Sequence, residues 1–87
     1  MDNDFNFLDS AQAELLKGIL ARRNSVLFAR VQRTPLMSRS DADEIVTTIS
    51  DELTDNLDEE WEPTEYGRTV NEVLTKFNTA RIGEWPA

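Results

Sequence analysis

The sequence predicts an all-α fold, a small helical bundle formed by a single domain of 87 residues. Apolar residues recur at steps of three and four along three segments, which is the period of a helix that buries one face. Capping residues and prolines bound these segments, and no strand-like alternation runs for more than a few residues. Between a lead-in segment (1–8) and a C-terminal tail (83–87), we expect helices at about 10–33, 41–60 and 64–82.

The first predicted helix is the longest. Asp9 and Gln12 have the spacing of a capping box, so we expect the helix to begin beside Asp9. The pattern continues to Thr34-Pro35, because a residue that precedes proline is disfavoured in the α region. About 24 residues would span roughly 36 Å. Gly18 and Asn24-Ser25 are the points where this helix could bend.

The second predicted helix carries one narrow apolar stripe. Ser40 is a suitable N-cap, and acidic residues in the first turn complement the helix dipole. Trp61 closes the stripe, so we expect its side chain in the core or in an interface. The stripe consists of Ala42, Ile45, Val46, Ile49, Leu53, Leu57 and Trp61.

The third predicted helix follows Glu62-Pro63. Pro63 suits the first helical position, Thr64 is an alternative N-cap, and Gly83 fits a C-terminal cap. Trp85 could pack back onto the phenylalanines of the lead-in segment, or it could be exposed for a partner. The apolar stripe of this third helix consists of Tyr66, Val70, Val73, Leu74 and Phe77, and Ala80 could extend it.

The composition narrows the possible functions. The chain has no His and no Cys, so it lacks the commonest general base, the Cys nucleophile, disulfides and the usual zinc ligands. The remaining chemical groups form no catalytic motif that we identify. We therefore predict a non-catalytic protein that needs no cofactor and no metal ion.

The sequence also bears on location. Residues 1–4 are acidic rather than basic, and no apolar run approaches the roughly 20 residues of a membrane span. We expect a cytoplasmic protein without membrane contact. A net charge of −8 opposes direct binding to nucleic acid.

Charge is strongly segregated along the chain. Residues 10–39 hold six basic residues and one acidic residue, a net charge of +5. Residues 40–65 hold eleven acidic residues and no basic residue, a net charge of −11. The first predicted helix is therefore basic and the second is strongly acidic.

Two arginines lie inside the apolar arc of the first helix. Arg23 and Arg30 fall close to Ile19 and Leu27 at helical spacing. Each could lay its stem along the apolar face and keep its charged head in water. Each could instead hold a small anion or a partner's carboxylate. A third interpretation pairs them with the acidic helix, either in the same chain or in a second subunit.

The acidic segment also has more than one interpretation. It could be a solvated face that confers solubility. Its acids nevertheless have no basic neighbour at helical spacing, and some repel one another four residues apart. That cost favours a basic partner, whereas a divalent cation is disfavoured because no EF-hand-like loop is present. We expect the partner contact at Asp51, Asp55, Asp58, Glu59, Trp61 and Glu62.

We also expect a homodimer. A first helix of roughly 36 Å would carry more apolar surface than two shorter helices can cover. The basic first helix could then meet the acidic second helix across a two-fold axis.

Two resemblances bear on these expectations. The stretch Glu14-Leu15-Leu16 to Leu20-Ala21-Arg22-Arg23 resembles the first helix of short all-helical chorismate mutases. That family surrounds a dicarboxylate substrate with cations, and residues 40–65 provide none, which argues against this activity. In size and acidity the chain is also similar to bacteriocin immunity proteins, which are small helical inhibitors of basic nucleases.

The sequence therefore predicts a small acidic interaction module of the adaptor, inhibitor or antitoxin type, with an acidic second helix that meets a basic partner. The alternative is a helical-bundle protein in which Arg23 and Arg30 hold a small anion. Such a protein would be either a ligand-binding protein or an enzyme.

Overall fold

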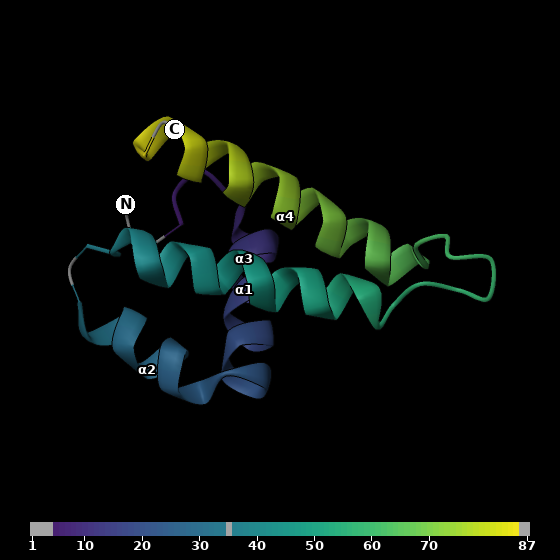
Figure 1. The fold of residues 1–87 in the computed structure, drawn as a ribbon, viewed down its shortest axis with the longest axis horizontal. Helices are drawn as coiled ribbons and strands as arrows, with labels where there is room; N and C mark the ends of the chain where they lie inside the picture. The colour runs from purple at the N-terminus through teal and green to yellow at the C-terminus, as the bar shows by residue number, and fades with distance from the viewer. Residues whose placement is uncertain (1–4, 35, 86–87) are drawn as a thin grey trace.

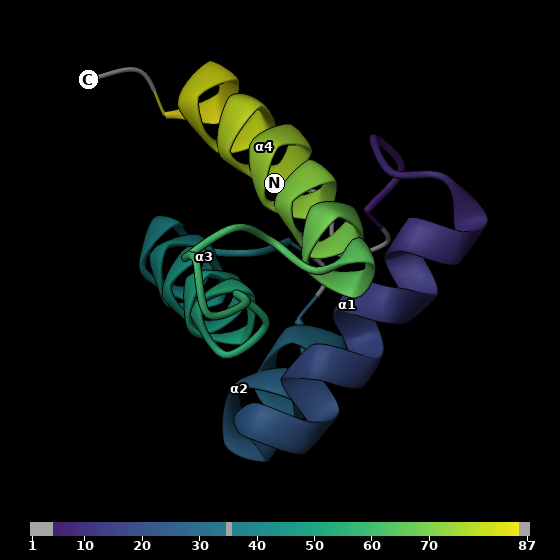
Figure 2. The ribbon, with the colours of Figure 1, turned by 90° about the vertical axis from the view of Figure 1, so that its right-hand side faces the viewer.

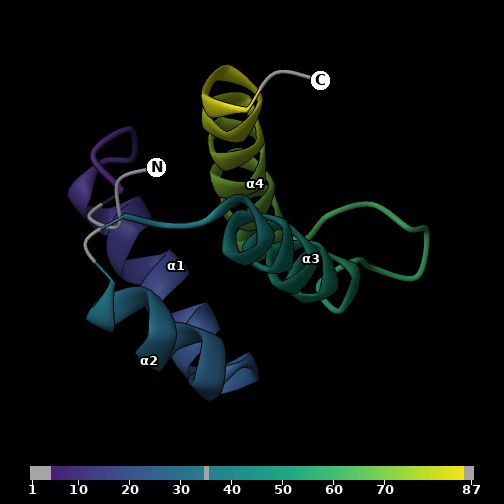
Figure 3. The ribbon, with the colours of Figure 1, turned by 60° about the vertical axis from the view of Figure 1, so that its left-hand side comes forward.

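The structure, a computed structural model, describes residues 5–34 and 36–85. These residues form four helices: α1 (Ser10–Arg23), α2 (Ser25–Arg33), α3 (Arg39–Thr54) and α4 (Glu65–Glu84). The predicted all-α class is confirmed, and the prediction of three helices is wrong. Helices α3 and α4 run side by side in opposite directions, and α1 crosses them (Figure 1). Helix α2 turns back from the end of α1 (Figures 2 and 3).

The predicted first helix is broken at Asn24. This residue leaves the helical region, with φ −150° and ψ 73°. Its backbone N–H donates to the carbonyl of Leu20 at 2.9 Å and closes α1. Its side-chain oxygen accepts the N–H of Leu27 at 3.1 Å and so caps α2. One residue therefore ends one helix and begins the next, whereas Gly18 lies within α1.

The other helix ends follow local capping chemistry. The predicted capping box is confirmed, because Asp9 Oδ1 accepts the N–H of Gln12 at 2.8 Å and the Gln12 side chain accepts the N–H of Asp9. Helix α3 starts earlier than predicted, since its N-cap is Ser38 rather than Ser40. Thr64 is the N-cap of α4, as the second alternative proposed.

Two predicted helix ends are wrong. Helix α4 runs through Gly83 to Glu84, so this glycine is not a C-terminal cap. Helix α3 ends at Thr54 rather than near residue 60. If the helix continued, the acidic residues that follow Thr54 would lie near the negative C-terminal end of the helix dipole and be repelled by it. In addition, the Asn56 side chain donates to the Glu52 carbonyl at 2.8 Å, which satisfies one of the last acceptors of the helix.

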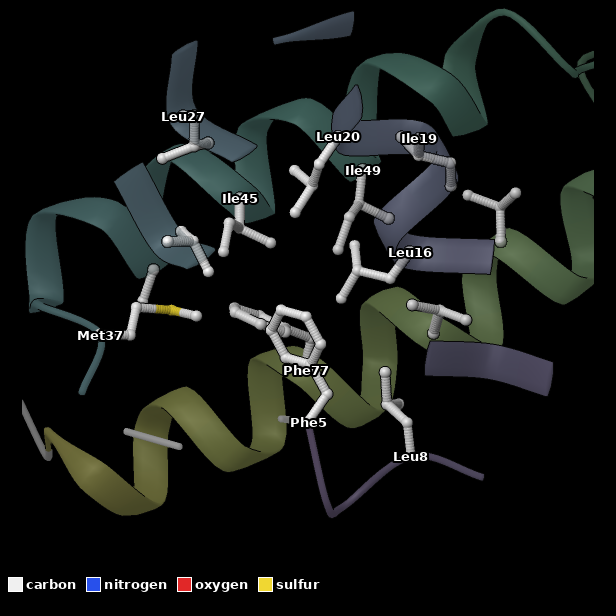
Figure 4. Packing of buried hydrophobic residues seen from close by; sticks show 14 residues of the cluster. Phe5, Leu8, Leu16, Ile19, Leu20, Leu27, Met37, Ile45, Ile49 and Phe77 are labelled. Carbon is white, nitrogen blue, oxygen red and sulfur yellow. The ribbon is translucent and has the colours of Figure 1, made fainter. Parts of the chain in front are cut away.

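One hydrophobic cluster includes residues from all four helices and from the lead-in segment (Figure 4). Phe5 is 2% exposed, and its ring lies 6.2 Å from that of Phe77. The Phe7 ring lies 5.7 Å from Phe77 as well. Trp85 is half-buried and packs against the same cluster. The lead-in segment is therefore part of the core from Phe5 onward, while its residues 1–4 lie outside the described residues.

The exposed positions of the helices include polar residues and also the apolar side chains Val26 of α2 and Ile82 of α4. No helix within the described residues combines the length and the apolar content that crossing a membrane requires.

Candidate interaction surface

The buried carboxylate of Glu52 connects three helices. Its residue is 2% exposed and lies on α3. It accepts hydrogen bonds from Arg22 Nη2 and Arg23 Nε of α1, the latter at 2.6 Å, and from the Tyr66 hydroxyl of α4 at 2.6 Å. Burial by itself would raise the pKa of Glu52, but the bonds from Arg22, Tyr66 and Arg23 outweigh it and lower the pKa to about 2. Glu52 is therefore ionised in the folded protein at neutral pH.

Other pairs continue along α3. Arg23 also binds the carboxylate of Asp55. Arg30 of α2 donates to Asp41 at 2.9 Å and to Glu44 at 3.1 Å. In each case a basic side chain of α1 or α2 meets carboxylates of α3 or of the residue that caps it.

Helix α4 also provides a basic partner for an acidic residue of α3. Arg81 of α4 donates to Asp43 at 2.8 Å. Four acidic residues of α3 are thus paired with arginines of α1, α2 and α4 within one chain, whereas Asp51 is in no ion pair among the described residues. For Arg23 and Arg30, the structure brings together the basic and acidic segments without a second subunit.

The acidic residues after α3 are arranged differently. They lie between Asp55, the C-cap of α3, and the start of α4, in a segment that we call the acidic loop (residues 56–64) and that extends beyond the bundle (Figures 1 and 3). Among the described residues, none of Asp58, Glu59, Glu60 and Glu62 lies in an ion pair. Glu59, Glu60 and Glu62 are exposed, as is Asp58. The structure therefore separates a helix whose acidic residues are mostly paired from four exposed acidic residues of the loop that have no countercharge among the described residues.

Hydrogen bonds within the loop itself hold the acidic loop in place. The Asp58 carboxylate accepts the N–H groups of Glu60 at 2.8 Å and Glu62 at 3.0 Å. The Asp58 N–H donates to the Glu62 carbonyl at 2.7 Å, and the Trp61 N–H donates to the Asp58 carbonyl at 3.0 Å. These four bonds form a compact turn at the end of the loop.

The base of the loop is fixed against α4. Leu57 and Pro63 form an isolated antiparallel bridge, and the Thr64 N–H donates to the Asn56 carbonyl at 2.9 Å. A Cβ atom placed on Gly67 would lie only 2.8 Å from the Asn56 carbonyl oxygen. Glycine at position 67 thus allows the chain before α4 to approach the helix closely.

Trp61 lies in this turn and points into solvent. It is 77% exposed and has φ 65°, in the left-handed region. The prediction that Trp61 closes a buried helical stripe is wrong, because α3 ends seven residues earlier, at Thr54. The residue is not part of the core and takes a backbone conformation that costs roughly 1–2 kcal/mol for a non-glycine residue.

The predicted partner-binding residues are divided between three places. Asp58, Glu59, Trp61 and Glu62 lie together in the acidic loop. Asp55 lies at the end of α3 and is engaged by Arg23. Asp51 lines a separate, open groove of about 740 Å³ beside α3 and the Asn24 break. The groove is lined by Arg23, Asn24, Ser40, Asp43, Glu44, Thr47, Thr48 and Asp51.

Two acidic residues, the buried Glu52 of α3 and the exposed Glu60 of the acidic loop, are absent from the predicted set of partner-binding residues. A signal for Glu52 exists in the sequence, because it lies seven residues after Ile45 and three after Ile49, both of which are fully buried. Helical spacing therefore puts this carboxylate on the core face of α3. Glu60 lies in the same turn as Trp61, but the prediction of a helix there gave no reason to include it.

Within the described residues, no group of three or more Asp or Glu side chains is placed so that it could hold a metal ion. Comparison with protein-family models, with curated proteins and with solved structures finds no match for this chain.

Proposed function

We propose that this chain is a small non-catalytic interaction module, of the adaptor, inhibitor or antitoxin type, that presents its acidic loop to a basic partner protein. One observation supports this proposal above the others. Of the acidic residues of α3, Asp41, Asp43, Glu44 and Glu52 have countercharges within the chain, whereas Asp58, Glu59, Glu60 and Glu62 of the loop have none among the described residues.

A basic partner would complete the pattern of charges. Like charges close together in one loop repel one another, and an approaching positive surface relieves that repulsion. Complementary charge also raises the rate of association and selects the orientation of the partner. The lack of cysteine in the sequence is in keeping with a reducing compartment. We therefore also propose that the protein is located in the cytoplasm.

The alternative function, a bundle that binds a small anion through Arg23 and Arg30, has less support. Each guanidinium already donates to two carboxylates, Arg23 to Glu52 and Asp55, and Arg30 to Asp41 and Glu44. A free anion would have to displace them. A rise in melting temperature with dicarboxylates or phosphates would favour this alternative, because a bound ligand stabilises the folded state by mass action.

Affinity capture with two matched variants tests the proposal. Glu59→Gln/Glu62→Gln removes two charges from the acidic loop, and Glu14→Gln/Glu72→Gln removes two exposed charges from other helices. We expect proteins retained at low salt to be lost at about 0.5 M salt, where charges are screened within roughly 4 Å. We expect the loop variant, and not the control, to lose the same proteins. Partners that are indifferent to both salt and the loop variant would contradict the proposal.

Self-association is a separate proposal. The break at Asn24 removes the long unbroken helix on which the dimer was predicted, and Leu16, Ile19 and Leu20 of α1 are covered by the chain itself. The exposed apolar side chains Val26, Leu36 and Ile82 are what a second copy could cover. Light scattering at micromolar concentration measures the mass directly, and a monomeric mass would end this proposal.

A further inference from the structure

The exposed indole of Trp61 is the starting observation. Of the large apolar side chains that the structure describes, Trp61 is the most exposed, at 77%, followed by Val26 at 70%. Tryptophan is among the residues most enriched where proteins contribute strongly to binding energy. The exposed indole, rather than the acidic residues that flank it in the sequence, is therefore the feature that suggests a bound partner.

The surroundings of the indole decide the chemistry of that occupant. Glu59, Glu60 and Glu62 flank Trp61 in the sequence, and no basic residue occurs between Arg39 and Arg68. An exposed aromatic ring in a segment rich in carboxylates attracts a cation and repels an anion such as nucleic acid.

The arginines that approach the end of α3 are already engaged. Arg22 and Arg23 are held there by Glu52 and Asp55. The acidic loop itself is fixed by the Asp58 turn and by the Leu57–Pro63 bridge, so the indole stands on a defined backbone. Among the described residues, no basic side chain of the chain itself pairs with Asp58, Glu59, Glu60 or Glu62, so these carboxylates are open to a cation from another molecule.

We propose that Trp61 is the central contact for an arginine-bearing segment of a partner protein. A guanidinium group is planar, so it can stack on the indole while its N–H groups bind the carboxylates of Glu59, Glu60 or Glu62. Lysine offers a compact, strongly hydrated charge and matches this combination less well. The inference rests on the proposed function, since it names the partner chemistry of the same loop.

Peptide titration against the full chain tests the inference. The probe is a short peptide of alternating arginine and glycine, and the same peptide with lysine in place of arginine is its match. In a Trp85→Phe background, fluorescence reports Trp61 alone, and calorimetry measures affinity in every variant. We expect the arginine peptide to bind more tightly than the lysine peptide and to change the Trp61 emission.

The variants separate the indole from the charge. We expect Trp61→Ala to weaken arginine-peptide binding by roughly two- to thirtyfold, the range of a cation–π contact. Trp61→Phe should restore part of the affinity, and Glu14→Gln/Glu72→Gln should leave it unchanged. Circular dichroism checks that each variant is folded, and the Trp61→Phe result supports the inference only if the protein retains its helix content.

Specific results would overturn the inference. If Trp61→Ala binds as tightly as the parent while Glu59→Gln/Glu62→Gln binds more weakly, the indole has no role, although the proposed function survives. If the arginine peptide does not bind, or if the control variant weakens it as much as the loop variant, the inference is wrong. If Trp61→Ala converts a dimer into a monomer, the occupant is a second copy and the inference is wrong as well.

Discussion

The hydroxyl of Tyr66 on α4 donates a hydrogen bond to the buried carboxylate of Glu52 on α3 at 2.6 Å. The same carboxylate accepts bonds from Arg22 and Arg23 of α1. Since Glu52 is 2% exposed, removing a donor leaves a buried charge with fewer partners. Glu52 therefore links α1, α3 and α4, and we expect the free energy of unfolding to depend on each of these hydrogen bonds.

Removal of the Tyr66 hydroxyl should destabilise the fold. We expect Tyr66→Phe to lower the free energy of unfolding by about 1.5–3 kcal/mol, the usual cost of losing one hydrogen bond to a charged group. Urea denaturation followed by circular dichroism measures it. In the Glu52→Gln background the same substitution should cost less, because the acceptor is then uncharged. Equal costs in both backgrounds would show that the bond to Glu52 contributes nothing.

Stability should depend on pH through Glu52. The folded pKa of about 2 lies below the usual value of 4.5, so the contribution is present above pH 4.5 and is lost as the pH falls toward 2. A tenfold change in an acid dissociation constant corresponds to about 1.4 kcal/mol, and solvent around Arg22 reduces the total, so we expect about 2 kcal/mol. The difference between wild type and Glu52→Gln, measured by urea denaturation across this range, isolates it. A difference that stays constant with pH would contradict the assignment.

Two glycines, Gly18 of α1 and Gly67 of α4, should respond in opposite ways to alanine. At Gly67 a Cβ atom would meet the Asn56 carbonyl at 2.8 Å, so the loop or the helix must shift, at a cost of roughly 1–3 kcal/mol. At Gly18 nothing lies within 4 Å, and alanine should stabilise α1 by about 1 kcal/mol because of its helix propensity. Urea denaturation compares the two. A stabilising Gly67→Ala would mean that the acidic loop does not pack closely on α4.

The Asn24 side chain should stabilise the fold by capping α2 at its break from α1. Its side chain accepts the Leu27 N–H, and we expect Asn24→Ala to cost about 1 kcal/mol, the usual value of an N-cap. Asn71→Ala, at an exposed position of α4, is the matched control and should be neutral or slightly stabilising. Asn24→Asp should keep most of the stability, since aspartate caps helices equally well. Loss of stability in the control alone, measured by urea denaturation, would contradict this role.

Much of the fold could be predicted from the sequence. The capping box of Asp9 and Gln12, the Thr64 cap and the apolar spacing of α3 and α4 depend on residues three or four apart, so they are visible in a linear pattern. The segregation of charge was equally clear. Less of the candidate site could be predicted, because the continued spacing at Leu57 and Trp61 indicated a helix where the chain forms a loop.

What the sequence by itself determined was therefore local: the helical class, the starts of α1 and α4, and the division into a basic and an acidic segment. Only the tertiary structure decided which charges meet, because Arg23 and Glu52 are separated by 29 positions and Arg81 and Asp43 by 38. It also decided that α3 ends at Thr54 and that Trp61 faces solvent. The physical reason is range, since caps and periodicity act within one helical turn, whereas burial and ion pairing depend on chain segments that only folding brings together.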